Sequence, residues 1–243
     1  MAVQKIQIQI PCFVDQFKPE TGMNLVKVLE KAGCQVNYNP EQTCCGLPAF
    51  NAGQWEDSRQ VAEKFLDEIS VDKNLVCAAS ACTSMIRNSY DLLFQNSSFH
   101  NKYRQLQKKT FELSEFLIDV LKIDQLGARF DGKVLLMDSC QATGHCGIAA
   151  QPRQLLKHVE GLELLELPRA GMCCGFGGMF AVRSEAMSVS MGLEIIEAAE
   201  LAGATAITST DTTCLIQLES LLKNKPHSGL KVLHLADILA SGW

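Results

Sequence analysis

Two Cys-Cys-Gly tripeptides recur at the same place in a repeated cysteine pattern, and this pattern constrains the chain more than any other feature. A single cysteine precedes each tripeptide, with 31 intervening residues in the first half and 32 in the second. Another cysteine follows each Cys-Cys pair after 36 and 39 residues. Eight of the eleven cysteines therefore form two sets of four in the same order, which predicts two similar domains. The sets are Cys12, Cys44, Cys45 and Cys82, and Cys140, Cys173, Cys174 and Cys214.

The adjacent cysteines point to metal binding. Neighbouring cysteines rarely bridge to each other, because the resulting ring is strained. Thiolates are the ligands that soft metals and iron–sulfur clusters select. Four thiolates also suit a tetrahedral zinc site, but zinc ligands usually come in pairs spaced by about two to four residues. The spacing therefore favours one iron–sulfur cluster per repeat, with zinc at one or both sites as the alternative.

Composition excludes several other classes of function. The chain has 243 residues, is 47% hydrophobic and carries a net charge of −5, so it suits one large or two small globular domains. An acidic chain without basic runs gives no electrostatic reason to bind nucleic acid. We find no apolar run long enough to span a membrane and no secretion signal, so we expect a cytoplasmic protein with reduced thiols.

Strands and helices alternate in both halves, which predicts an α/β fold with mainly parallel sheets. The two halves repeat this order, so we expect two tandem, pseudo-symmetric α/β domains. Predicted strands cover residues 6–10, 35–38, 75–78, 133–137, 162–167 and 206–209. The predicted divisions are a first domain over residues 1–100, a helical linker with the end of the first repeat over 101–130, and a second domain over 131–243.

Each single cysteine falls just beyond the carboxyl end of a predicted strand, and each Cys-Cys pair falls in a loop between a strand and a helix. In open α/β sheets this edge is where ligands bind. We therefore predict that the four cysteines of each set converge at the carboxyl ends of the strands, and that this edge carries the metal sites.

The other chemically interesting residues have plainer interpretations. Cys34, which we place at the end of a helix, and Cys77, inside a strand, are expected to be buried packing residues. Cys146 follows His145 in the loop after the second repeat's first cysteine, so a ligand or redox role for Cys146 and a proton-transfer role for His145 stay open.

Two carboxylates stand at strand ends beside the second cysteine set. Asp138 precedes Cys140, and Asp211 precedes Cys214. Carboxylates at such places cap helices or carry protons, and we expect capping.

Three segments carry a resemblance to a known family. They are residues 12–20 (CFVDQFKPE), 42–49 (QTCCGLPA) and 173–180 (CCGFGGMF). Together with the doubled spacing, they resemble the cysteine-rich CCG domain, which occurs in one of the subunits of heterodisulfide reductase, in the iron–sulfur subunit of glycolate oxidase and in two-domain proteins of lactate utilization. The resemblance covers essentially the whole chain.

The resemblance implies an iron–sulfur subunit of a complex that oxidises L-lactate, or a related 2-hydroxy acid, to pyruvate. It also implies other subunits as partners, including a ferredoxin-like iron–sulfur protein. The full family motif ends in C-x-x-C, but here Ala79 and Asp211 replace its first cysteine. The complete motif is associated with clusters that cleave disulfides, so four cysteines per repeat favour plain electron transfer. A zinc-stabilised scaffold and a thiol–disulfide reductase subunit remain the alternatives.

Overall fold

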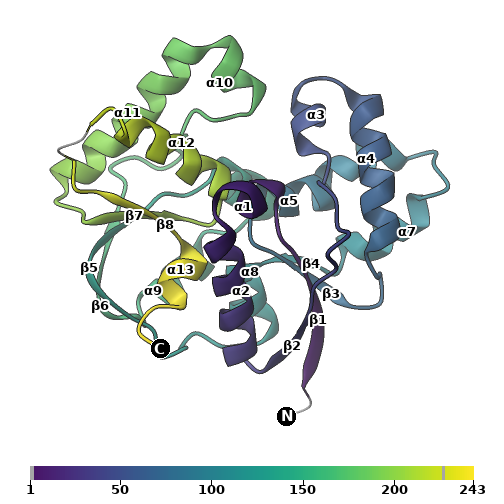
Figure 1. The fold of residues 1–243 in the computed structure, drawn as a ribbon, viewed down its shortest axis with the longest axis horizontal. Coiled ribbons are helices and arrows are strands. Elements are labelled where there is room, and N and C mark those ends of the chain that lie inside the picture. Colours follow the sequence, from purple (N-terminus) through teal and green to yellow (C-terminus); the bar gives the residue numbers. More distant parts are fainter. Residues whose placement is uncertain (1–2, 226–227) are drawn as a thin grey trace.

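Two four-stranded sheets form the framework of the chain, one in each half (Figure 1). The fold comes from a computed structural model that describes residues 3–225 and 228–243. The first half contains β1 Gln4–Gln9, α1 Cys12–Phe17, α2 Pro19–Lys31, β2 Cys34–Asn37, α3 Leu47–Asn51, α4 Trp55–Glu68, β3 Asn74–Cys77, α5 Ser80–Ser84, η1 Met85–Ser89, α6 Tyr90–Phe94, α7 His100–Gln107, β4 Thr110–Glu112, α8 Leu113–Glu115 and η2 Phe116–Val120. The second contains β5 Arg129–Leu136, η3 Gln141–Cys146, α9 Ala150–Leu156, β6 Glu160–Glu166, α10 Met179–Arg183, α11 Glu185–Leu201, β7 Ala206–Ser209, α12 Thr212–Leu222, β8 Lys231–His234 and α13 Leu235–Leu239.

The two sheets have the same topology. Their strand orders are β2-β1-β3-β4 and β6-β5-β7-β8, and every neighbouring pair is parallel. In each sheet the chain reverses its direction of winding between the first and third strands of the repeat. Such a switch point opens a crevice at the carboxyl ends of the two strands, and this is where α/β folds bind ligands.

Both faces of each sheet pack against a hydrophobic core. Alternate side chains of a strand point to opposite faces, so successive residues enter different cores. On β5 and just after it, Val134 and Leu136 point into a core shared by the two halves, whereas Leu135 and Met137 point into an outer core of the second half. The first half has a matching outer core around Phe65. The molecule is therefore built in five layers, with helices on the outside, two sheets, and a shared helical layer between them.

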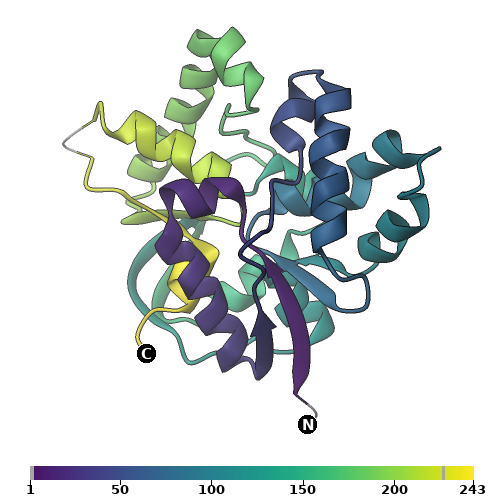
Figure 2. The ribbon, with the colours of Figure 1, turned by 45° about the vertical axis from the view of Figure 1, so that its right-hand side comes forward.

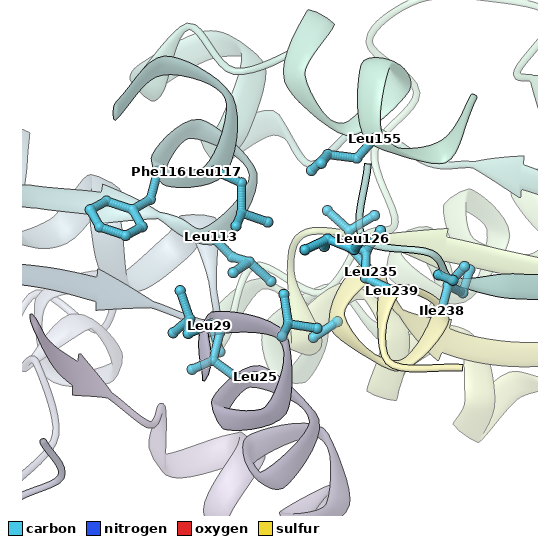
Figure 3. Close-up of a cluster of buried hydrophobic side chains, with 14 of the residues drawn as sticks. Leu25, Leu29, Leu113, Phe116, Leu117, Leu126, Leu155, Leu235, Ile238 and Leu239 are labelled. Atoms are coloured by element: carbon cyan, nitrogen blue, oxygen red, sulfur yellow. The ribbon is translucent and has the colours of Figure 1, made fainter. Parts of the chain in front are cut away.

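The shared core joins the two repeats (Figure 3). Leu25 and Leu29 of α2 lie in one apolar cluster with Leu235 and Leu239 of α13, and Leu117 of η2 belongs to the same cluster. Helix α2 packs on α13, and α8 packs on α9. Since α2 corresponds to α9 and α13 to α8, these two contacts are equivalent under a pseudo-two-fold axis.

A second pair of contacts obeys the same symmetry. Helix α5 packs on η3, and α12 packs on α1. Figures 1 and 2 show the α3–α4 and α10–α11 helices projecting on the same side of the molecule, away from both chain ends. The axis therefore passes between the repeats, through the region where α1, α5, η3 and α12 meet.

The structure confirms the predicted fold class of two tandem α/β domains with parallel sheets. One local prediction was wrong: Cys34 begins β2 instead of ending a helix, because α2 ends at Lys31 and Gly33 turns the chain with a φ of 84°. Segment 101–130 includes β4, which pairs with β3 and so supplies the fourth strand of the first sheet. Within the described residues, no helix is both long and apolar enough to cross a membrane.

Candidate functional site

The cysteines of both sets line one cavity between the repeats, with a volume of about 150 Å³. Cys45, Cys82, Cys174 and Cys214 are buried, Cys12, Cys44 and Cys173 are partly exposed, and Cys140 is exposed. The walls between the thiols are mostly apolar and include Phe13 and Phe176, whose rings pack edge to face across the boundary of the repeats at 5.6 Å. The two repeats therefore present their cysteines to a common space.

Strand ends and helix starts position the single cysteines. Cys12 opens α1 just after β1, and Cys82 lies in the first turns of α5 just after β3. The side chain of Gln42 donates to the carbonyl of Ile10 at 2.7 Å and accepts from its amide at 3.3 Å, which ties the loop before Cys44 to the end of β1. The switch point of the sheet thus gathers segments that are distant in sequence.

Glycine is required after each Cys-Cys pair. Gly46 and Gly175 adopt φ values of 88° and 78°, which favour a residue without a side chain. A β-carbon on Gly46 would lie 2.9 Å from the carbonyl oxygen of Ser58 on α4, and one on Gly175 would lie 2.5 Å from that of Ser188 on α11. Each pair is therefore held close to the helix that follows it, and both repeats use the same device.

The thiols contact one another in pairs. The Sγ atoms of Cys12 and Cys44 are 3.8 Å apart, and those of Cys45 and Cys82 are 3.5 Å apart. In the second repeat, the Sγ atoms of Cys174 and Cys214 are 2.7 Å apart. All eleven cysteines, which lie within the described residues, are free thiols.

The first cysteine of each Cys-Cys pair has the most acidic thiol of its set. Hydrogen bonds from Cys12 and then from Cys45 lower the pKa of Cys44 to about 3. Those from Cys140 and then from Cys174 lower the pKa of Cys173 to about 2. Backbone amides contribute, since the amide of Gly46 donates to Cys44 Sγ at 3.4 Å and that of Gly175 to Cys173 Sγ at 3.5 Å.

The partners of these two thiols show the opposite effect. Hydrogen bonding to Cys44 and burial raise the pKa of Cys12, and hydrogen bonding to Cys173 and burial raise that of Cys140. Each repeat therefore favours a thiolate at the first cysteine of its pair, the form in which sulfur binds metal or acts as a nucleophile.

A buried carboxylate joins the two sets. Asp211 is 1% exposed, lines the cavity and caps α12 by accepting from the amide of Thr213 at 3.0 Å. It also accepts from Ser80 Oγ at 3.0 Å and from the amide of Ala81 at 2.8 Å, both at the start of α5 in the other repeat. The sequence predicted the cap on α12 but gave no signal for the contact with α5, whose residues are distant along the chain.

The remaining predicted residues lie outside the cavity lining. Cys146 is partly buried, its Sγ lies 3.9 Å from the carbonyl of Ser80, and burial raises its pKa to about 12. His145 is exposed, and its carbonyl accepts from Asn88 of the other repeat at 3.0 Å. Asp138 forms an ion pair with Arg153 at 2.7 Å in place of the expected cap.

Cys34 and Cys77 are buried among apolar side chains, at 6% and 0% exposure, as a packing role predicts. Burial raises the pKa of both thiols.

Comparison with known protein families assigns both repeats to one family. The CCG family, described as a cysteine-rich domain, matches the chain twice, over residues 6–87 and 134–219. The chain belongs to the CCG family. Both matched CCG domains contain one complete set of four cysteines, so the doubled pattern is a tandem pair of CCG domains.

Relatives of similar length match this chain over almost its whole length. Lactate utilization protein A of Bacillus subtilis is 35% identical over 238 residues, which cover 98% of this chain and 99% of that protein. Lactate utilization protein A of Bacillus licheniformis is 34% identical over 239 residues, again 98% of this chain and 99% of the relative. Among solved structures, a putative Asp/Glu racemase from Yersinia pestis covers 98% of this chain and 96% of its own at 12% identity, with a TM-score of 0.38, a likeness too low to carry an argument.

The donor set of the two CCG domains fits an iron–sulfur group. Eight cysteine sulfurs, which are soft ligands, line the cavity, and backbone amides reach the sulfurs of Cys44 and Cys173, as they do where protein amides tune iron–sulfur clusters. The hydroxyl of Thr212 is buried at the cavity wall without a hydrogen-bond partner among the described residues, so it is available to a bound group. Among those residues, no three His, Cys, Asp or Glu side chains converge tightly enough for a single metal ion.

Proposed function

We propose that the chain is an iron–sulfur electron-transfer subunit of a complex that oxidises L-lactate, or a related 2-hydroxy acid, to pyruvate. One observation carries the proposal: two sets of four thiols face one cavity at the switch points of two parallel sheets. The names of the relatives, which refer to lactate utilization, supply the substrate class.

Each CCG domain would hold its own iron–sulfur cluster. The ligands in the first domain would be Cys12, Cys44, Cys45 and Cys82, and in the second Cys140, Cys173, Cys174 and Cys214. A bound cluster would supply one-electron transfer. Hydrogen bonds from neighbouring cysteines lower the pKa values of Cys44 and Cys173, which favours the metal-binding thiolate form at these two positions. The apolar walls would keep water from the four buried sulfurs, which are those of Cys45, Cys82, Cys174 and Cys214.

The proposal extends to partners and location. Oxidation of lactate to pyruvate releases two electrons, so a chain that carries single electrons needs a donor and an acceptor subunit. We expect a ferredoxin-like iron–sulfur protein to be one of them. The free thiols need a reducing compartment, which supports the cytoplasm as the location.

Metal analysis of anaerobically purified protein tests the cofactor. We expect about four iron and four sulfide per set, as in a cubane cluster, and an electron paramagnetic resonance signal that changes on addition of dithionite. Cys45→Ser and Cys174→Ser should each lose the iron of one set, whereas Cys34→Ser, a buried cysteine away from the cavity, should retain both. Stoichiometric zinc without sulfide would replace this function with a structural scaffold.

Growth tests the substrate. Deletion of the gene from its source organism is expected to abolish growth on L-lactate and to leave growth on pyruvate intact. Complementation with the Cys34→Ser gene should restore growth, and complementation with Cys45→Ser should not. Equal growth of the deletion strain on both carbon sources would refute a role in lactate oxidation.

A second candidate function is thiol–disulfide exchange, favoured by the close contact between Cys174 and Cys214 and by the acidic thiol of Cys173. Protein without metal would then accelerate the reduction of a small disulfide, such as oxidised glutathione, by dithiothreitol above the rate without protein. Failure to do so, together with retained iron, leaves the electron-transfer function.

A further inference from the structure

The side-chain carboxylate of Asp211 accepts five hydrogen bonds, and they come from both repeats. Its Oδ1 accepts from the amide of Thr213 at 3.0 Å and from its hydroxyl at 2.6 Å, both in α12. Its Oδ2 accepts from Ser80 Oγ at 3.0 Å, from the amide of Ala81 at 2.8 Å and from Ser139 Oγ at 3.3 Å. One carboxylate therefore satisfies groups at the starts of two helices and beside the loop that carries Cys140.

The two helices that Asp211 holds each carry a cavity thiol. Cys82 follows Ala81 directly in α5, and Cys214 follows Thr213 directly in α12. Their exposures are 7% and 5%. A further hydrogen bond, from the amide of Ser80 to the carbonyl of Thr210 at 3.1 Å, holds the same two helix starts together. The position of either thiol thus depends on a residue of the second repeat.

We propose that Asp211 is a positioning residue for both cysteine sets, which fixes Cys82 of the first repeat and Cys214 of the second at the cavity at the same time. Its negative charge is buried beside both sets, so it also disfavours the addition of an electron at either one. The effect on potential rests on the proposed function, whereas the effect on the thiols does not.

The chain offers a matched control in Asp237. This carboxylate also caps a helix, α13, and also accepts hydrogen bonds from the other repeat, from Thr21 Oγ1 at 3.0 Å and from Asn24 Nδ2 at 3.0 Å. It lies at the α2–α13 contact and does not line the cavity. Asp237→Asn therefore loosens the repeats without touching α5 or α12.

Thiol alkylation tests the positioning role in metal-free protein. Iodoacetamide labelling followed by mass spectrometry should show Cys82 and Cys214 reacting at least about tenfold faster in Asp211→Asn, because a buried hydrogen-bonded charge is lost at both helix starts. Asp237→Asn should leave both rates unchanged. Ser80→Ala is a milder variant that keeps the carboxylate, and it should accelerate the alkylation of Cys82 alone. It replaces Asp211→Asn as the test if that variant does not fold.

Iron-loaded protein supplies the second readout. Asp211→Asn should release iron from both sets to a chelator about 10- to 100-fold faster, as expected when a group that orients ligands is lost. The midpoint potentials of both sets should shift to more positive values, which a merely structural role would not require.

The outcomes separate this inference from the proposed function. Faster alkylation of Cys214 alone in Asp211→Asn would show that Asp211 only caps α12. Equal alkylation rates in Asp211→Asn and Asp237→Asn would show that Asp211 only links the repeats in a general way. Either result overturns the inference. Wild-type protein that holds no iron would refute the proposed function, and the alkylation rates would still decide the role of Asp211.

Discussion

At the scale of single residues, the glycine after each Cys-Cys pair limits the chain most strictly. Gly175 has a φ of 78°, and a β-carbon there would meet the carbonyl of Ser188 at 2.5 Å. The left-handed conformation and the contact with α11 act together, so alanine would be strained twice. The same pair of constraints holds at Gly46 against Ser58.

We expect Gly175→Ala to destabilise the metal-free protein by about 2–4 kcal/mol, from left-handed strain plus overpacking. The matched control is Gly203→Ala, because Gly203 has a φ of 68° and open space where a β-carbon would be added. That variant should cost about 1 kcal/mol, from strain alone. Urea unfolding measures both changes, and equal costs would show that the contact with Ser188 is unimportant.

Glu112 should make the folding stability of the protein depend on pH. The residue is fully buried, its Oε2 caps α8 by accepting from the amide of Ser114 at 2.7 Å, and its Oε1 has no hydrogen-bond partner among the described residues. Burial raises its pKa from 4.5 to about 7 despite the hydrogen bonds. The folded protein thus holds this proton more tightly than the unfolded chain, so stability falls as the pH rises from 4.5 to about 7.

Glu112→Gln should remove this pH dependence, because the amide oxygen keeps the cap and the side chain no longer ionises. Relative to wild type, the variant should gain up to about 3 kcal/mol between about pH 4 and pH 8. Urea unfolding of both proteins at several pH values gives the difference, in which other titrating groups cancel. A difference that stays constant with pH would contradict the raised pKa.

At the scale of elements, the cap of α13 also joins two helices. Asp237 accepts from the amide of His234 at 2.9 Å in a capping box, and the same carboxylate accepts from Thr21 of α2 at 3.0 Å. Helix capping and helix packing therefore share one carboxylate at the contact between the repeats.

Thr21→Val should cost about 1–3 kcal/mol, since it removes a partly buried hydrogen bond to a charged group while keeping the shape of the side chain. Thr208→Val is the control, because the Thr208 hydroxyl on β7 is buried and has no partner among the described residues. That change should be neutral or stabilising. Thermal unfolding would contradict this account if both variants lost the same stability.

The local sequence pattern predicted the positions of most strands closely. The strand predicted at 206–209 is β7, Ala206–Ser209, and the strand predicted at 75–78 is β3, Asn74–Cys77. Both strands are short, almost continuously buried runs, which is the pattern of a strand covered on both faces of a parallel sheet. Cys34 was misplaced because it was assigned to the helix before Gly33, whereas the turn at Gly33 separates α2 from β2 and leaves Cys34 as the first residue of the strand.

The site was less predictable because it depends on how the repeats dock. The positions of the cysteines at the predicted strand ends indicated that each set of four converges. No local sequence pattern indicates that both sets meet in one cavity. Asp211 and Ser80 are separated by 131 positions in sequence, so their contact exists only once α5 and α12 have come together. Side chains that pack between repeats are set by non-local contacts, which a single sequence does not reveal.

At the scale of the whole molecule, the shared core should make the two repeats unfold together. Each half contains one tryptophan: Trp55 stacks on Phe50 in the first, and Trp243 lies over Lys31 with 4.8 Å from the ammonium to the ring. Trp55→Phe and Trp243→Phe therefore leave one fluorescent reporter in each half. We expect both single-tryptophan proteins to unfold with the same midpoint.

Leu29→Ala in the shared core should lower both midpoints equally, at a cost of about 2–5 kcal/mol. Leu29 is fully buried, whereas Leu201, at 90% exposure, is the control whose change to alanine should leave both midpoints in place. Separate transitions for the two reporters would show that the repeats are independent units.

The pseudo-symmetric positions Ala79 and Asp211 show what joining the repeats in one chain permits. A homodimer of a single CCG domain would carry the same residue at both positions beside its axis. With aspartate in both copies, two carboxylates would share one buried space and repel each other, and with alanine in both, neither helix start would have a carboxylate partner. A tandem duplication frees the two copies to diverge, so that one supplies the carboxylate and the other leaves room for it. A fused pair of domains can therefore have different residues at the two positions beside the cavity, whereas a symmetric dimer cannot.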